Sequence, residues 1–258
     1  MYNFDYVKAS SVADATAALG GEASPISGGQ TLIPTLKQRL AAPSKLVDLS
    51  GVAEMSAITD NGDSVTVGGA VTHETVAANG AIPALSALAG GIGDPAVRHR
   101  GTIGGSVANN DPSACYPSAC LGLGATIHTS VGDVAADDFF TGLFETSLAE
   151  GAIVTGVTFP KPAKAAYVKF VQPASRFALV GVFVSQMADG YTRVAVTGAS
   201  GDGVFRWTDA EAALSANWSA DAAPAAPAAD GMIADLHGSA AYRAHLVSVI
   251  TKRAVAAA

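Results

Sequence analysis

Two glycine-rich segments with a shared pattern constrain this sequence most strongly. The first reads Ser27-Gly28-Gly29-Gln30-Thr31, and the second, after Gly101, reads Thr102-Ile103-Gly104-Gly105-Ser106. Glycine reaches positive φ angles without strain, and its missing Cβ lets a ligand approach main-chain N–H groups. Both segments end in a small hydroxyl residue. This combination is typical of loops that bind phosphate groups.

The separation of the two segments strengthens this interpretation. One glycine pair alone is most simply a tight turn, because the chain contains 28 glycines. Two segments that share a pattern and lie far apart in the sequence predict instead two sides of one cradle around a diphosphate. We therefore expect main-chain amides of both segments to face the same ligand.

The composition limits the classes of partner. The chain has 258 residues, of which 49% are hydrophobic, and this allows a large core and two or three subdomains. Charged residues make up only 14% and the formal net charge is −7, which argues against nucleic acid or an anionic membrane as a partner. The sequence shows no secretory signal pattern and no apolar run of about 18 residues, so we expect a cytoplasmic protein without a membrane span.

The cysteine and acidic residues do not predict a metal site. Cys115 and Cys120 are too few for a Cys₄ zinc site or an iron–sulfur cluster, and no CxxC or HxxxH spacing accompanies them. Buried thiols are their expected role. The pair Asp137-Asp138 has the chemistry to bind a cation, but a solvated turn with a helix cap is the simpler interpretation. We therefore expect no metal in this chain.

The order of the predicted elements divides the chain into three subdomains. Alternating strands and helices predict one α/β subdomain over residues 1–55 and a second over residues 56–162. A meander of three antiparallel strands, followed by helices that end with an amphipathic one, predicts a third subdomain over residues 163–258. The predicted strands of this meander are 167–171, 177–185 and 193–198. The fold class is therefore α+β.

A further glycine motif, Gly91-Ile92-Gly93-Asp94-Pro95-Ala96, matches the G-x-G-x-x-A expression of dinucleotide-binding folds. The preceding residues 84–89 are helix-like, whereas a nicotinamide site needs a strand there. No suitable acidic residue follows a second strand about 20 residues later. We therefore reject this motif as a nicotinamide site.

In their wider context, the two glycine segments resemble the signature loops of a known family. The stretches SGGQTLIP at residues 27–34 and RHRGTIGGSVAN at residues 98–109 are similar to the two loops of the FAD-binding medium subunit of molybdenum hydroxylases. This family includes carbon monoxide, xanthine, aldehyde and N-heterocycle dehydrogenases. The resemblance covers essentially the whole chain, from the opening Phe4-Asp5-Tyr6 to the stretch at residues 238–246.

The resemblance implies a fold and a cofactor. The family fold has two α/β subdomains of the PCMH type that sandwich FAD, followed by a C-terminal subdomain with a three-stranded antiparallel sheet and helices. The two loops would hold the FAD diphosphate with its flanking ribityl and ribose oxygens, and an apolar residue would lie near the flavin ring. The residues that match these positions are Ser27, Gly28, Gly29, Gln30, Thr31, Thr102, Ile103, Gly104, Gly105, Ser106, Val154 and Lys169.

Three of the matched or neighbouring positions need separate comment. Lys169 matches a family lysine near the flavin, where a cation stabilises anionic reduced flavin, and the alternative is a solvent-facing strand residue. Cys115 stands where many family members have aspartate, so a carboxylate often used near the cofactor is missing. Gln30 replaces a histidine or asparagine of some relatives. Neither change removes a phosphate cradle that consists mostly of backbone amides.

The function implied by the resemblance is electron transfer within a multi-subunit oxidoreductase. Electrons from a molybdenum cofactor on a large partner subunit would pass through 2Fe-2S clusters on a small partner subunit and reduce FAD on this chain. They would then leave to a quinone, NAD or oxygen. Because the flavin supplies the redox chemistry, no catalytic side chain is expected here. The stretch PASRF at residues 173–177 is similar to carbon-monoxide-dehydrogenase-like members, and a dimer of heterotrimers is the expected assembly.

Two alternative functions stay open at this point. A stand-alone FAD-dependent oxidase or reductase would need its own substrate pocket, but the chain is short for this and lacks a long substrate-binding domain rich in aromatic residues. A non-enzymatic α/β scaffold that has lost its cofactor is the second alternative, and Cys115 is its only sign. The substrate, whether carbon monoxide, an aldehyde, a purine or another N-heterocycle, would bind on the large partner.

Overall fold

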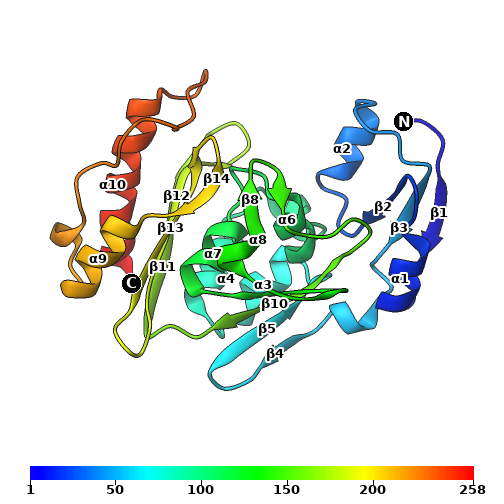
Figure 1. Cartoon of the computed structure of the whole chain (residues 1–258), viewed down its shortest axis with the longest axis horizontal. Coiled ribbons are helices and arrows are strands. Elements are labelled where there is room, and N and C mark those ends of the chain that lie inside the picture. Colours follow the sequence, from blue (N-terminus) through cyan, green and yellow to red (C-terminus); the bar gives the residue numbers. More distant parts are fainter.

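Three main sheets, each built from a different stretch of the chain, organise the fold (Figure 1). The computed structural model describes all 258 residues. The first sheet lies within residues 5–48, the second within 58–160 and the third within 164–206. They follow one another across the molecule in chain order, from blue to yellow in Figure 1. No helix combines the length and the apolar character that crossing a bilayer requires.

The first sheet is small and parallel. Strands β1 (Asp5–Lys8), β3 (Lys45–Asp48) and β2 (Ala23–Ile26) lie in that order, and both outer strands run parallel to β3. Parallel strands need crossover connections, which helices α1 (Val12–Ala18) and α2 (Leu32–Lys37) supply. The first glycine segment directly follows β2. It therefore leaves from the carboxyl end of a parallel strand, the edge where α/β sheets bind ligands.

The second sheet is antiparallel and has the strand order β4-β5-β10-β6-β7. Five helices belong to this part of the chain, and all but the shortest of them contribute to a cluster of 26 buried residues, which contains Val65, Ile127 and Val157 from the strands. The strands are β4 (Ile58–Asp60), β5 (Ser64–Gly68), β6 (Thr126–Thr129), β7 (Gly132–Ala135) and β10 (Val154–Pro160). The helices are α3 (His73–Asn79), α4 (Pro83–Gly90), α5 (Pro95–Arg98), α6 (Ile103–Asn109) and α7 (Tyr116–Leu123).

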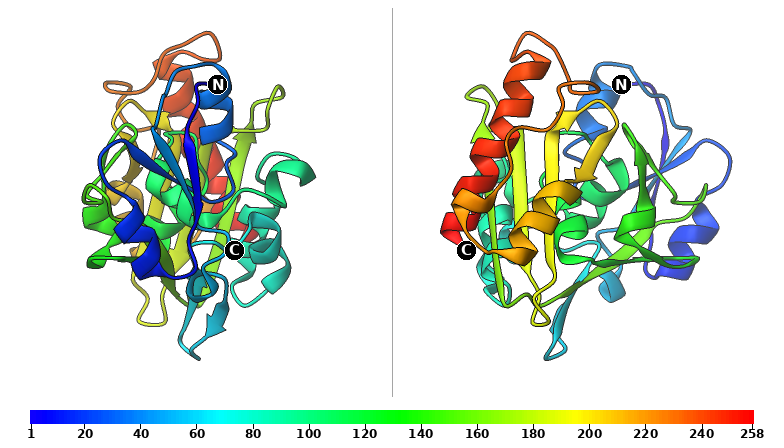
Figure 2. Two further views of the ribbon diagram at one scale, coloured as in Figure 1. Left: turned by 90° about the vertical axis from the view of Figure 1, so that its right-hand side faces the viewer. Right: turned by 60° about the vertical axis from the view of Figure 1, so that its left-hand side comes forward.

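The third sheet has four antiparallel strands where the sequence predicted three. The predicted meander is present as β11 (Lys164–Val171), β12 (Ala178–Gln186) and β13 (Thr192–Ser200), and β14 (Gly203–Arg206) extends it after a tight turn. Four residues are too few to show an alternating pattern, so β14 gave no strand signal in the sequence. Helices α9 (Thr208–Ala216) and α10 (Ala240–Ala257) cover one face of this sheet (Figure 2).

Strand β12 joins the second and third parts of the core. Val182 and Val184 belong to the cluster beneath α10, whereas Phe183 belongs to the cluster around α7. Successive side chains of a strand point to opposite faces, so β12 is buried on both sides. A Cβ added to Gly122 in α7 would lie 2.7 Å from the Phe183 ring, so helix and sheet pack closely here.

Asp137 also ties the second part to the third, and one prediction about it was wrong. Its carboxylate accepts two hydrogen bonds of 3.0 Å from the guanidinium of Arg193 on β13, and Arg206 lies 3.5 Å away. Asp137 and Asp138 lie in the short helix α8 (Ala136–Phe139), which leads into the hairpin of β8 (Phe140–Gly142) and β9 (Glu145–Thr146). The two acidic residues are exposed, as expected, but neither caps a helix, and Asp137 forms an ion-paired contact between α8 and the third sheet.

Arg243 provides a test of how α10 is attached. Its side chain is 2% exposed and donates to the carbonyls of Leu179 and Gly198 at 2.8 and 2.7 Å, and to the Asp235 carboxylate. Arg243→Met leaves two buried carbonyls without donors, so we expect the free energy of unfolding to fall by about 3 kcal/mol. Urea denaturation measures this loss. The matched change Arg253→Met, on the exposed face of the same helix, should alter it by less than about 0.5 kcal/mol.

Candidate functional site

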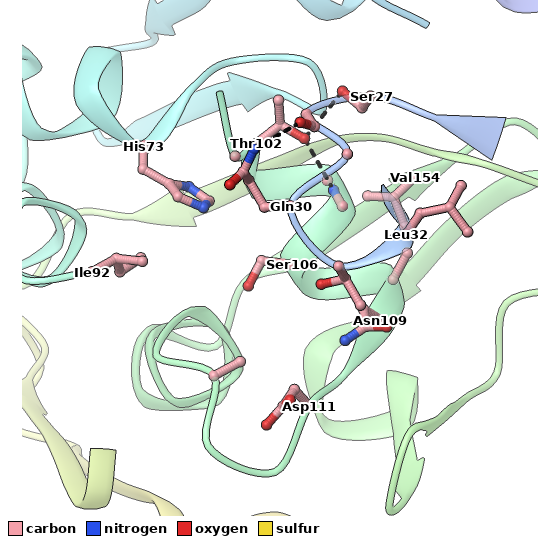
Figure 3. Close-up of a pocket in the computed structure, with 18 of the residues that line it drawn as sticks. Ser27, Gln30, Leu32, His73, Ile92, Thr102, Ser106, Asn109, Asp111 and Val154 are labelled. Carbon is pink, nitrogen blue, oxygen red and sulfur yellow. Dashed lines mark hydrogen bonds between the residues drawn. The ribbon is translucent and has the colours of Figure 1, made fainter. Parts of the chain in front are cut away.

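A cavity of about 850 Å³ is lined by residues from all three parts of the chain (Figure 3). Its walls include the first glycine segment, α6, the segment between α4 and α5, the start of β10 and the connection between β11 and β12. Cavities that hold cofactors commonly have volumes of roughly 300–1,000 Å³ and mix apolar walls with a few polar groups. This cavity fits that description, and it contains both glycine segments.

All but one of the predicted site residues line this cavity. The exception is Ile103, whose side chain is 0% exposed and belongs to the core between α6 and the second sheet. Residues that line the cavity are Ser27, Gly28, Gly29, Gln30, Thr31, Thr102, Gly104, Gly105, Ser106, Val154 and Lys169. The sequence pattern therefore identified one continuous surface from segments that are far apart in the chain.

The two glycine segments touch each other. The Thr102 hydroxyl donates a 3.1 Å hydrogen bond to the Ser27 hydroxyl, across 75 positions of sequence (Figure 3). A Cβ added to Gly28 would lie 2.0 Å from the carbonyl oxygen of Arg100, a distance that no real side chain could keep. Glycine is therefore required at position 28 because the two backbones meet there, and not because of its φ angle.

The first segment presents a row of free amides. The backbone N–H groups of residues 27–31 donate no hydrogen bond within the chain, and helical bonding begins with the Ile33 amide, which donates to Gly29. Gly29 has a φ of +70°, which turns the backbone around the cavity at a position that favours glycine. A run of unpaired amides on a concave surface is a binding site for an anion. This cradle fits a phosphate group.

The second segment has a different role from the one predicted. Thr102 caps helix α6, and the amides of Ile103 and Gly104 donate to the carbonyls of Val71 and Gly69 at 3.1 and 2.9 Å. The Gly105 amide faces the Thr102 hydroxyl at 3.4 Å. Of the amides of residues 102–106, only that of Thr102 donates no hydrogen bond within the chain, so the expectation of free amides in both segments reduces to a single amide in the second one. It contributes hydroxyl groups and a closely packed wall.

Close packing also explains Gly104 of this second segment. Gly104 lies within helix α6, and a Cβ there would lie 2.6 Å from the carbonyl oxygen of Gly69. Neither Gly104 nor Gly105 has a positive φ angle. The pattern shared by the two segments therefore has two physical causes. One is close approach of two backbones, at Gly28 in the first segment and at Gly104 in the second, and the other is the positive φ of Gly29, which turns the first segment into an amide cradle.

His73 is a residue of the cavity that sequence analysis assigned only to a helix. Its side chain lies at the start of α3, is 5% exposed, and points toward the cavity (Figure 3). Burial, with a smaller effect of the Arg98 cation, lowers the pKa of His73 to about 4, so the ring is neutral at pH 7. Its Nδ1 has no hydrogen-bond partner. Nothing in the local sequence indicates this burial, because the neighbours of the ring include Tyr116 of α7 and the backbone at Gly101, which are distant in the sequence.

Lys169 and Cys115 lie together at another part of the wall. The Lys169 ammonium donates to the carbonyls of Gly91 and Arg176, both at 2.8 Å, and lies 3.7 Å from the Cys115 sulfur. Lys169 is thus a hydrogen-bonded, partly exposed residue of the cavity wall. Ile92, from the motif that we rejected as a nicotinamide site, also lines the cavity. No three His, Cys, Asp or Glu side chains are grouped so that they would hold a metal ion.

The buried state of His73 predicts a pH dependence of stability. Between pH 6.5 and about 4, His73 is protonated in the unfolded chain but stays neutral in the folded chain. The free energy of unfolding therefore falls as the pH falls through this range. The loss attributable to His73 amounts to about 3 kcal/mol. His73→Gln should remove that part of the slope in urea denaturation. The matched change at the exposed His99, His99→Gln, should keep it.

Comparison with known proteins agrees with this geometry. A family model described as an FAD binding domain in molybdopterin dehydrogenase matches residues 2–162. The chain is 35% identical to the nicotine 6-hydroxylase medium subunit of Paenarthrobacter nicotinovorans, over 89% of this chain and 87% of that protein. It is 30% identical to the carbon monoxide dehydrogenase medium chain of Hydrogenophaga pseudoflava, over 99% and 96% of the two chains.

Solved structures show the same fold. Quinoline 2-oxidoreductase from Pseudomonas putida 86 contains a chain that superposes with a TM-score of 0.87 at 30% identity, covering 100% of this chain and 97% of that one. A chain of carbon monoxide dehydrogenase from Hydrogenophaga pseudoflava gives the same TM-score at 29% identity. The fold class and the family resemblance are both confirmed. The chain belongs to the family of FAD-binding domains of molybdopterin dehydrogenases and is similar over nearly its whole length to the medium subunits of multi-subunit oxidoreductases.

Proposed function

We propose that this chain binds FAD in the described cavity and transfers electrons as the medium subunit of a molybdenum hydroxylase. The observation that carries the proposal is the row of unpaired amides at residues 27–31, which lines a cavity of cofactor size. FAD brings a diphosphate that these amides would satisfy, and it supplies the redox chemistry when bound. The chain's own contribution is to bind, orient and shield that group.

The proposed contacts follow from where each residue lies. The amides of residues 27–31 hold the diphosphate, and the hydroxyls of Thr102 and Ser106 lie beside them. Val154 and Ile92 offer apolar contacts for the flavin ring. Gly104 and Gly105 form the wall that holds the hydroxyls in place. Ile103 acts from the core, where it anchors α6, and not by contact.

The proposed electron path involves partner chains. The chain accepts electrons that come from a molybdenum cofactor on a large subunit through 2Fe-2S clusters on a small subunit, and it passes them to a quinone, NAD or oxygen. The printed names of the relatives, which call them medium subunits or medium chains, support such an assembly. We propose three subdomains, 1–55, 56–162 and 163–258, each of which contains one main sheet.

Two observations disfavour the alternative functions. A stand-alone oxidase would need additional chain for a substrate domain, but this chain spans 96% of the length of a carbon monoxide dehydrogenase medium chain. A scaffold that had lost its cofactor would not need the run of amides at residues 27–31, which donate no hydrogen bond within the chain and line a cavity of cofactor size. The buried Cys115 leaves the amide cradle intact, since it lies in the wall near Lys169.

Two variants, each with one glycine replaced by alanine, test FAD binding. The purified chain should show a flavin visible spectrum or take up added FAD. Gly28→Ala places a Cβ 2.0 Å from the Arg100 carbonyl oxygen and displaces the amide cradle, so we expect FAD affinity to fall at least about tenfold. Gly20→Ala, at a glycine with open space around it, is the control and should bind as the parent does. A parent chain that takes up no FAD would refute the proposal.

The partner assignment is tested by native purification. The chain should be isolated from its own cells with one larger chain that contains molybdenum and one smaller chain that contains iron and sulfide. Metal analysis and mass spectrometry of the purified complex identify both. Isolation of the chain alone, with an oxidase or reductase activity of its own, would instead establish the stand-alone alternative.

A further inference from the structure

The segment Gly91-Ile92-Gly93 is held by cationic side chains from other elements. Its three consecutive carbonyls accept hydrogen bonds from outside the segment: Gly91 from Lys169 at 2.8 Å, Ile92 from Arg98 at 3.2 Å, and Gly93 from Arg98 and Arg176 at 3.4 Å. The segment connects α4 to α5, and Ile92 and Gly93 line the cavity. Its position in the cavity wall therefore depends on side chains that are distant in the sequence.

Lys169 joins this segment to a second one. Its ammonium also donates to the Arg176 carbonyl at 2.8 Å, within the connection between β11 and β12 that places Ser175, Arg176 and Phe177 on the cavity. Arg176 has a φ of +63°, a backbone conformation that a long side chain rarely adopts without support. The Lys169 hydrogen bond supplies support at this point of the chain.

The ammonium of Lys169 has no donor left for a ligand. A lysine ammonium carries three N–H donors. Two of them are directed at the Gly91 and Arg176 carbonyls, and the Cys115 sulfur lies at 3.7 Å as the third neighbour. A lysine that served mainly as a cationic contact for the cofactor would keep at least one donor free. The geometry indicates a side chain that connects two parts of the protein.

We propose that Lys169 is a positioning residue that closes one part of the cavity wall. It ties the segment at residues 91–93 to the connection at residues 172–177, and so holds Ile92 and Phe177 against the space where the flavin would lie. That the enclosed group is FAD rests on the proposed function, whereas the tie between the two segments is a property of the chain alone. Its effect on the cofactor is to slow release.

The tie is tested first on the cofactor-free chain. The amides of Ile92 and Arg176 donate to Ala89 and Gln172, so their hydrogen exchange reports whether the two segments stay in place. In Lys169→Met, exchange at residues 91–93 and 172–177 should become faster, while the strands of the second sheet keep the parent rates. Lys161→Met is the matched control, because Lys161 pairs with Asp60 on the second sheet and does not line the cavity. Unchanged exchange at both segments in Lys169→Met would overturn the proposal.

The FAD-loaded chain provides the second test. We expect Lys169→Met to release FAD about tenfold faster, from the loss of two charge-assisted hydrogen bonds. Arg98→Met, which frees the next carbonyls of the same segment, should also speed release, and the double variant should show less than the product of the two effects. A more negative midpoint potential in Lys169→Met with a parent release rate would show that its charge acts directly on the flavin, and would overturn the proposal.

The two tests separate the possible failures. If the parent chain takes up no FAD, the proposed function fails, and hydrogen exchange still decides whether Lys169 ties the two segments. If FAD binds and Lys169→Met changes neither the release rate nor the exchange, the proposed function stands and the positioning role fails. Thermal unfolding of each variant establishes that it is folded. If Lys169→Met does not fold, Arg98→Met gives the same readouts for the segment at residues 91–93.

Discussion

The contact between Gly28 and the backbone at Arg100 is the constraint on which the site depends. It brings the connection after β2 against the residues that precede α6, and the Ser27–Thr102 hydrogen bond reinforces it. With the two backbones in contact, residues 27–31, whose amides donate no hydrogen bond within the chain, line the cavity. Any larger residue at position 28 would separate the two sides. The anion site is therefore a consequence of how two subdomains meet.

The sequence predicted where this site lies better than it predicted which backbone groups are free to bind a ligand. The repeated glycine pattern led to the correct cavity because both segments do lie on it. It did not reveal that Gly104 and Gly105 lie in a helix whose first amides are already bonded to Val71, Gly69 and Thr102. A glycine required by a positive φ angle cannot be told from a glycine required by close packing in the sequence alone. Only the neighbouring backbone distinguishes them.

The features that were missed depend on contacts between distant elements. His73 is neutral because it is buried beside Tyr116 of α7 and the backbone at Gly101, and Lys169 is bonded because two connections bring carbonyls to its ammonium. Strand β14 was missed because it is short, and the role of Asp137 because its partner Arg193 lies on another sheet. By contrast, the long strands β10, β12 and β13 carry enough apolar residues for their pattern to specify them.

Because β12 is buried on both faces, the C-terminal part of the chain is an integral part of the core. The family match ends at residue 162, but Phe183 and Ala195 lie in the same cluster as α7, and Arg176 and Phe177 complete the cavity wall. A fragment cut at that boundary would uncover an apolar helix face and leave the cofactor space open on one side. The smallest unit able to retain a flavin is for this reason longer than the conserved domain that defines the family.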